Sequence, residues 1–131
     1  MNNEKRPNWV KARAHCTLED TFEQVVDAIK HDVKCFNGLP PDKRVLPTVR
    51  HERIENTVHF GFEHPAGMHQ GPLVTVRIES AKVQVLRDRT FLFEVDRQWN
   101  EQTLTCDLLI EGKTYFLWQI SQKAIGDLLF E

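Results

Sequence analysis

The stretch HFGFEHPAGMHQGPLV, residues 59–74, holds three histidines whose side chains could bind a metal ion. His59, His64 and His69 follow one another at five-residue intervals, with a glutamate and a methionine between them. Imidazole is a common zinc ligand, but all ligands of one ion must lie about 2.0–2.1 Å from it. Five residues of strand span about 15 Å, and the prolines and glycines of residues 65–72 indicate a loop. We therefore expect no metal site and no cofactor. An approach of His64 to His69 across the loop stays open, although we expect the two to lie too far apart.

Alternation along two expected strands places four polar residues on one face of a sheet. In a strand, residues two apart share a face, so His59 and Glu63 lie opposite the phenylalanines at 60 and 62. Glu94 and Asp96 alternate in the same way with Phe93 and Val95. The candidate binding residues are therefore His59, Glu63, Glu94 and Asp96.

These four residues do not amount to a predicted catalytic site. Paired carboxylates divide acid and base roles only where their surroundings separate their pKa values, and a solvated strand face does not do so. We expect the carboxylates to pair with arginines of neighbouring strands, such as Arg77, Arg87 and Arg89. The chain also has no nucleophile elbow, phosphate loop, dinucleotide fingerprint or paired-histidine zinc motif.

Two tryptophans are candidate interface residues. Trp99 lies among polar residues in an expected turn over residues 98–102, and Trp9 precedes the first expected helix. Because large aromatic side chains often anchor protein interfaces, we expect Trp9 and Trp99 to contribute to one.

A long helix is expected over residues 17–37. Apolar residues recur there at helical spacing, Thr17 suits the N-cap, and Gly38 with the prolines at 40 and 41 ends the helix. Residues 49–120 alternate with period two between turn signals, which predicts an antiparallel meander. Residues 121–130 are expected to form a short helix. The predicted fold is α+β in a single domain, residues 1–131, with the long N-terminal helix packed on one face of a curved antiparallel sheet of about five to seven strands.

Composition narrows the classes of partner and compartment. The formal net charge is -2, and acidic residues are interleaved with the basic ones, so nucleic-acid binding is not expected. No segment is apolar enough to cross a bilayer, and no N-terminal apolar run resembles a signal peptide. With three cysteines and no C-x-x-C pair, we expect free thiols and a cytoplasmic protein.

Two hypotheses of function remain. The first is a non-enzymatic binding or protein-interaction domain, which associates with a second copy of itself or with another protein and could also take a small ligand. The second is a small enzyme whose site is assembled on the polar face of the sheet from His59, Glu63, Glu94 and Asp96, because catalytic sets often come together only in the folded chain.

Overall fold

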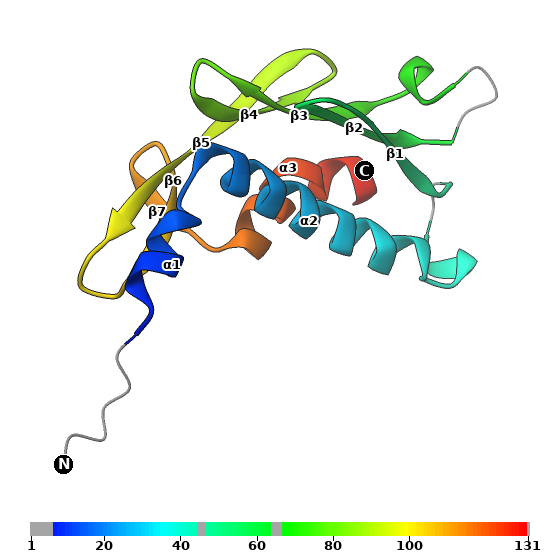
Figure 1. Cartoon of the computed structure of the whole chain (residues 1–131). Helices are drawn as coiled ribbons and strands as arrows, with labels where there is room; N and C mark the ends of the chain where they lie inside the picture. The colour runs from blue at the N-terminus through cyan, green and yellow to red at the C-terminus, as the bar shows by residue number, and fades with distance from the viewer. Residues whose placement is uncertain (1–6, 45–46, 64–66, 131) are drawn as a thin grey trace.

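The computed structural model describes residues 7–44, 47–63 and 67–130, which form three α-helices, two short 3-10 helices and seven strands (Figure 1). The helices are α1 (Trp9–Ala14), α2 (Leu18–Asn37), α3 (Leu117–Phe130), η1 (Pro41–Lys43) and η2 (Met68–Gln70). The strands are β1 (Val49–Ile54), β2 (Thr57–Phe62), β3 (Leu73–Glu79), β4 (Lys82–Arg87), β5 (Thr90–Asn100), β6 (Thr105–Ile110) and β7 (Lys113–Tyr115).

The expected α+β fold is confirmed. The strands form one antiparallel meander in the order β1-β2-β3-β4-β5-β6-β7, which is an open sheet with β1 and β7 at its edges. In Figure 1, β1–β4 lie over α2 and α3, whereas the long β5 continues past the helices and carries β6 and β7 to the side of α1. The sheet therefore has one face covered by helices and one outer face.

The core lies between the helices and the covered face of the sheet. On α2 the buried apolar side chains recur at helical spacing, and at Val58 and Phe60 of β2 and Val83 and Val85 of β4 they alternate as a half-covered sheet requires. On β3, residues 73–76 are all buried. The innermost large side chains are Phe22, Ile29, Phe60, Ile120 and Ile125. Burying five such side chains contributes about 1.5–3 kcal/mol each.

Local signals explain where α2 begins and how the strands turn. Thr17 caps α2, because its hydroxyl oxygen accepts the backbone N–H of Asp20 at 3.1 Å. Between β4 and β5, Asp88 and Arg89 form a turn with φ of 50° and 70°. Two consecutive positive φ values define the two-residue turn whose twist matches an antiparallel hairpin.

The C-terminal elements differ from the prediction. Residues 114–120 were expected to be a strand, but β7 ends at Tyr115 and α3 begins at Leu117, four residues before the expected start at 121. The side chain of Gln119 accepts the backbone N–H of Phe116 at 2.8 Å. Because a glutamine at the third helical position often bonds back to the residue before the helix, this contact helps to start α3 there.

The structure also differs from the expectations for the N-terminal part of the chain, for Trp99 and for two of the cysteines. Residues 9–14 form α1, which the sequence did not predict, and Trp99 lies on β5 rather than in a turn. Cys16 and Cys106 are not free thiols but form a disulfide across 90 residues, while Cys35 is free and exposed. The disulfide joins the junction between α1 and α2 to β6.

Candidate functional site

The outer face of the sheet carries a cluster of polar side chains around His59. His59 on β2 pairs in register with Thr75 on β3, and its Nδ1 lies 2.8 Å from the Thr75 hydroxyl oxygen. His59 also stands opposite Glu52 on β1. Three neighbouring strands thus bring His59, Thr75 and Glu52 to the same face.

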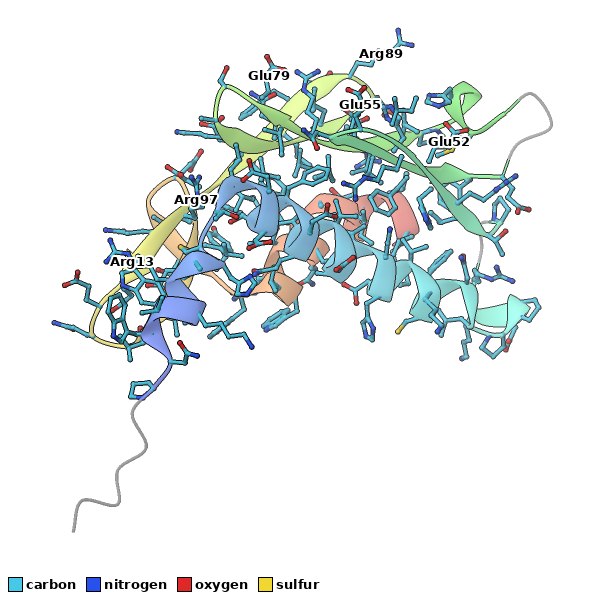
Figure 2. The ribbon with its side chains drawn as sticks, viewed as in Figure 1. Arg13, Glu52, Glu55, Glu79, Arg89 and Arg97 are labelled. Carbon is cyan, nitrogen blue, oxygen red and sulfur yellow. A yellow bond between two sulfur atoms is a disulfide. The ribbon has the colours of Figure 1, made fainter. Side chains whose placement is uncertain are left out.

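A second histidine reaches this cluster from η2. The Nε2 atom of His69 lies 2.8 Å from Glu52 Oε2, and the His59 and His69 rings meet edge to face with centroids 5.0 Å apart. Figure 2 shows Glu52 on the side of β1 that faces η2 and away from the helices. We call Glu52, His59, His69 and Thr75 the histidine cluster.

Gly61 allows η2 to lie directly on β2. A Cβ atom at Gly61 would lie 3.2 Å from the carbonyl oxygen of Met68 and 3.1 Å from a methyl carbon of Leu73. Met68 is buried in this contact. A glycine in mid-strand often marks such a close approach, and here it holds η2, and with it His69, near the sheet.

Burial is the main cause of an altered proton affinity at His59. Desolvation lowers the pKa of His59 below its ordinary value, the nearby His69 lowers it further, and Glu52 opposes both effects. A neutral imidazole can act as a hydrogen-bond acceptor or as a base.

In the described part of the chain, no group of three or more His, Cys, Asp or Glu side chains is placed to hold an ion. The expectation about His64 and His69 falls outside the described residues, because they do not include His64. The cavity beside the cluster, between β1 and η2, measures only about 120 Å³, well under the roughly 300 Å³ at which small-molecule sites begin.

Of the other candidate binding residues, Glu63 lines the small cavity beside the histidine cluster, whereas Glu94 and Asp96 lie apart from His59. Glu63 stands at the end of β2 with a carboxylate oxygen 4.0 Å from Arg50. Glu94 and Asp96 lie on β5, and β3 and β4 separate them from β2. Lys82 on β4 is their partner, at 3.3 Å and 3.9 Å, in place of the expected arginines. These two carboxylates border a cavity of about 380 Å³ near the turn between β6 and β7.

Trp9 lies on α1 and Trp99 lies beside α1, but the two side chains differ in exposure. Trp99 on β5 is half-buried, and the guanidinium of Arg13 from α1 lies 5.9 Å from its ring centroid. Trp9 begins α1 and is 47% exposed. Figure 2 shows Arg13 on α1 beside this part of the sheet.

A larger apolar groove runs between α2 and α3 on the side away from the sheet. It encloses about 490 Å³ and is lined by Asp32, Cys35, Phe36, Leu39, Gln122, Ile125, Gly126, Asp127, Leu129 and Phe130. The Phe36 and Phe130 rings meet edge to face at 5.8 Å, yet Phe130 remains 71% exposed. We call this feature the helical groove.

Two further aromatic side chains are exposed at the start of α3. Phe116 is 69% exposed and Trp118 is 62% exposed. Trp118, Gln122 and Gly126 follow at four-residue spacing, and the last two line the helical groove. The sequence could have revealed this side through that spacing, but the prediction of a strand over residues 114–120 concealed it.

Comparisons with protein-family models, with curated proteins and with solved structures found no match to this chain. None of the helices among the described residues combines the length and the hydropathy that crossing a bilayer requires.

Proposed function

We propose that this chain is a non-enzymatic interaction module that associates with a second copy of itself through the outer side of α3. The observation that supports this proposal is the exposure of Trp118 and Phe130, 62% and 71%, on the side of α3 whose Gln122 and Gly126 line the helical groove. Phe116, which is 69% exposed, borders a separate cavity beside β6 and β7. Exposed aromatic side chains gathered at a groove are a common mark of protein interfaces.

The exposed aromatic area is large enough to matter for association. A buried aromatic side chain removes about 150–250 Å² from water. Trp118 and Phe130, each exposed by roughly two thirds, would supply on the order of 200–330 Å². That is about a quarter to two fifths of the ~800 Å² that each partner buries in a standard interface. The remainder would come from the polar rim of α2 and α3.

A second copy suits this surface because it presents both a projecting ring and an apolar groove. Twofold symmetry brings the same patch of two subunits together, so Trp118 of each copy can enter the helical groove of the other. An opening of about 490 Å³ has ample room for an indole. A different protein and an apolar small ligand are the other occupants that such a surface suits, and the test below decides whether a second copy occupies it.

The test compares substitutions on α3 with a matched one on the opposite face. Trp118→Asp and Phe130→Asp should each convert the dimer to a monomer in size-exclusion chromatography with light scattering, because each places a charge in the contact. Phe91→Asp, at a side chain that is 55% exposed on β5, is the control and should leave the dimer intact. If the wild-type chain is a monomer, or if Phe91→Asp dissociates it equally, self-association through α3 is wrong.

A second candidate function is hydrolytic chemistry at the histidine cluster. It is favoured by the 2.8 Å contact between His59 and the Thr75 hydroxyl, since a base beside a hydroxyl is the arrangement that activates a nucleophile. Of the four residues expected to form an enzyme's site, this candidate function uses His59 but not Glu63, Glu94 or Asp96. Hydrolysis of p-nitrophenyl acetate above the buffer rate, lost in both His59→Gln and Thr75→Val, would support it. A rate equal to that of buffer would exclude it for esters of this kind.

The cytoplasmic location expected from the sequence is opposed by one observation. Disulfides form and persist mainly in oxidising compartments, and Cys16 is bonded to Cys106. Alkylation of thiols in intact cells, followed by mass spectrometry, distinguishes a cytoplasmic location from an oxidising compartment. A cytoplasmic protein should show both cysteines alkylated, whereas a protected pair would contradict that location.

A further inference from the structure

A second groove, between α2 and the edge strand β1, differs from the helical groove in position and charge. It encloses about 490 Å³. From α2 it is lined by Lys30, Val33, Lys34 and Asn37, which recur at the spacing of one helix face, and from β1 by Val49, Arg50 and His51. We call it the edge groove. Its lining includes two lysines, one arginine and one histidine but no aspartate or glutamate.

Among the described residues, the lysines of the edge groove form no close ion pair, although Glu23 at the end of the groove interacts electrostatically with Lys30. Arg53 and Glu23 already satisfy one another, with two contacts of 2.6 and 2.7 Å. That pairing lowers the pKa of Glu23 below its ordinary value, so the carboxylate stays charged and bound to Arg53. No carboxylate of the described residues lies within ion-pairing distance of Lys30 or Lys34. Arg50 pairs with Glu63 at 4.0 Å, which is the longest ion-pair distance among the described residues.

The backbone of β1 offers hydrogen-bonding groups at the same edge. The side chain of Asn37 bonds both the N–H and the C=O of Val49, at 2.8 and 2.9 Å. Both groups of Val49 therefore point away from β2, and in an antiparallel pair the same holds for every second residue. The N–H and C=O of His51 and Arg53 consequently point outward, where the described residues place no further strand.

Two bridges between β1 and α2 limit the length of the edge groove. Asn37 with Val49 forms one end, and Glu23 with Arg53 forms the other. The four steps from Val49 to Arg53 span about 13 Å of strand. That length accommodates about four residues of an extended peptide.

We propose that the edge groove binds an acidic segment of a partner protein in extended conformation, which aligns beside β1. Carboxylates of the segment meet Lys30 and Lys34, an apolar side chain meets the floor of Val33 and Val49, and the peptide backbone bonds the outward groups of His51. An edge strand rich in basic residues repels a strand like itself, which favours an acidic partner over a second copy. Nucleic acid is less suited, because no phenylalanine, tyrosine or tryptophan lines the groove for bases to stack on. The site uses other residues than the self-association proposed above.

The test uses a fluorescein-labelled octapeptide of alternating Glu and Val, measured by fluorescence anisotropy on the intact chain. The matched probes are a Lys and Val octapeptide and an eight-nucleotide oligothymidylate. The acidic peptide should bind, and the double substitution Lys30→Glu with Lys34→Glu should weaken binding at least about tenfold. The control double substitution, Lys11→Glu with Lys113→Glu, changes the net charge equally at exposed positions outside the groove and should have little effect.

The remaining outcomes separate the occupants. N-methylation of alternate peptide nitrogens should abolish binding if the peptide pairs with the β1 backbone, and unchanged binding would overturn the extended alignment. Stronger binding of the oligothymidylate, equal losses in both double variants, or no binding of the acidic peptide would overturn the proposal. A loss of self-association in the Lys30 and Lys34 variant, measured without peptide, would assign the groove to a second copy and also overturn it. Circular dichroism confirms that each variant is folded.

Discussion

Folding removes His59 from water and places it beside Thr75, His69 and Glu52, which affects the free energy of unfolding. Alternation along the chain predicted the face on which His59 lies. It could not predict its neighbours, because Thr75 comes from β3, Glu52 from β1 and His69 from η2, and strand register decides their meeting. The proposed companions Glu94 and Asp96 share that face, but two strands separate them from His59.

The free energy of unfolding should fall as the pH is lowered below about 6.5, the ordinary pKa of histidine. The pKa of His59 is lowered in the folded chain, chiefly by burial, so the unfolded chain binds the proton first. Its stabilising contribution is therefore present above pH ~6.5 and is lost as the pH falls towards the folded pKa. Urea denaturation at pH 7.5 and at pH 5 measures this loss, which should be smaller in His59→Gln.

The Glu52–His69 contact is the control for that comparison. His69→Gln removes this contact and the smaller effect of His69 on the pKa of His59, but it leaves the burial of His59, so most of the pH dependence should remain. An NMR titration that gives His59 a pKa of 6.5 or above would contradict the prediction, as would identical pH dependence in wild type and His59→Gln.

The helix α2 has the clearest sequence pattern and was predicted closely. The start of α3 has mixed signals and was predicted wrongly. For α2, the cap at Thr17 and the apolar stripe agree with one another, and the observed bounds differ from the prediction by one residue at the start. At residues 115–118 the run Tyr-Phe-Leu-Trp resembles a strand locally. The packing of Ile120, Ala124 and Ile125 against the core makes it the beginning of α3 instead.

The disulfide should make a large contribution to stability. It joins residues 90 apart in the sequence, and it ties β6 to the junction beside α1, a helix that has no buried residue. Removing a native disulfide from a small domain typically costs about 2–5 kcal/mol. Cys106→Ser should lower the free energy of unfolding in urea by about that amount.

Reductant provides the matched comparison for the disulfide. Wild-type chain in dithiothreitol should unfold like Cys106→Ser, and Cys35→Ser should behave like oxidised wild type, because Cys35 is free. Equal stability of oxidised and reduced wild type would contradict a stabilising disulfide.

Gly126 lies inside α3, where glycine is unfavourable, and its missing side chain deepens the helical groove. A Cβ atom there would meet only Gln122 Cγ at 3.8 Å, which is an ordinary contact. Gly126→Ala should therefore raise the free energy of unfolding by about 0.5–1 kcal/mol in urea denaturation.

The same substitution should weaken dimerisation, because the added methyl group makes the groove shallower. An interface elsewhere would lose nothing on Gly126→Ala, so unchanged association together with raised stability would argue against the helical groove as the contact.

In the whole molecule, α2 and α3 cover one sheet face, and their own outer side is left with exposed aromatic rings. The spacing of apolar residues predicted a layer of helices packed on a sheet, because a helix with one apolar face and strands with alternating residues must pack together. It could not predict the surface of α3, since the strand assigned to residues 114–120 placed Phe116 and Trp118 within the sheet. The proposed interface therefore lies mainly on α3 rather than at Trp9 and Trp99.

Sedimentation equilibrium at micromolar concentration tests self-association through α3 most directly. The wild-type chain should have twice the 15.3 kDa mass of one chain, and the double variant Trp118→Asp with Phe130→Asp should have 15.3 kDa. Phe91→Asp should keep the mass of the dimer. A wild-type mass of 15.3 kDa, or a dimer that persists in the double variant, would contradict the proposed function.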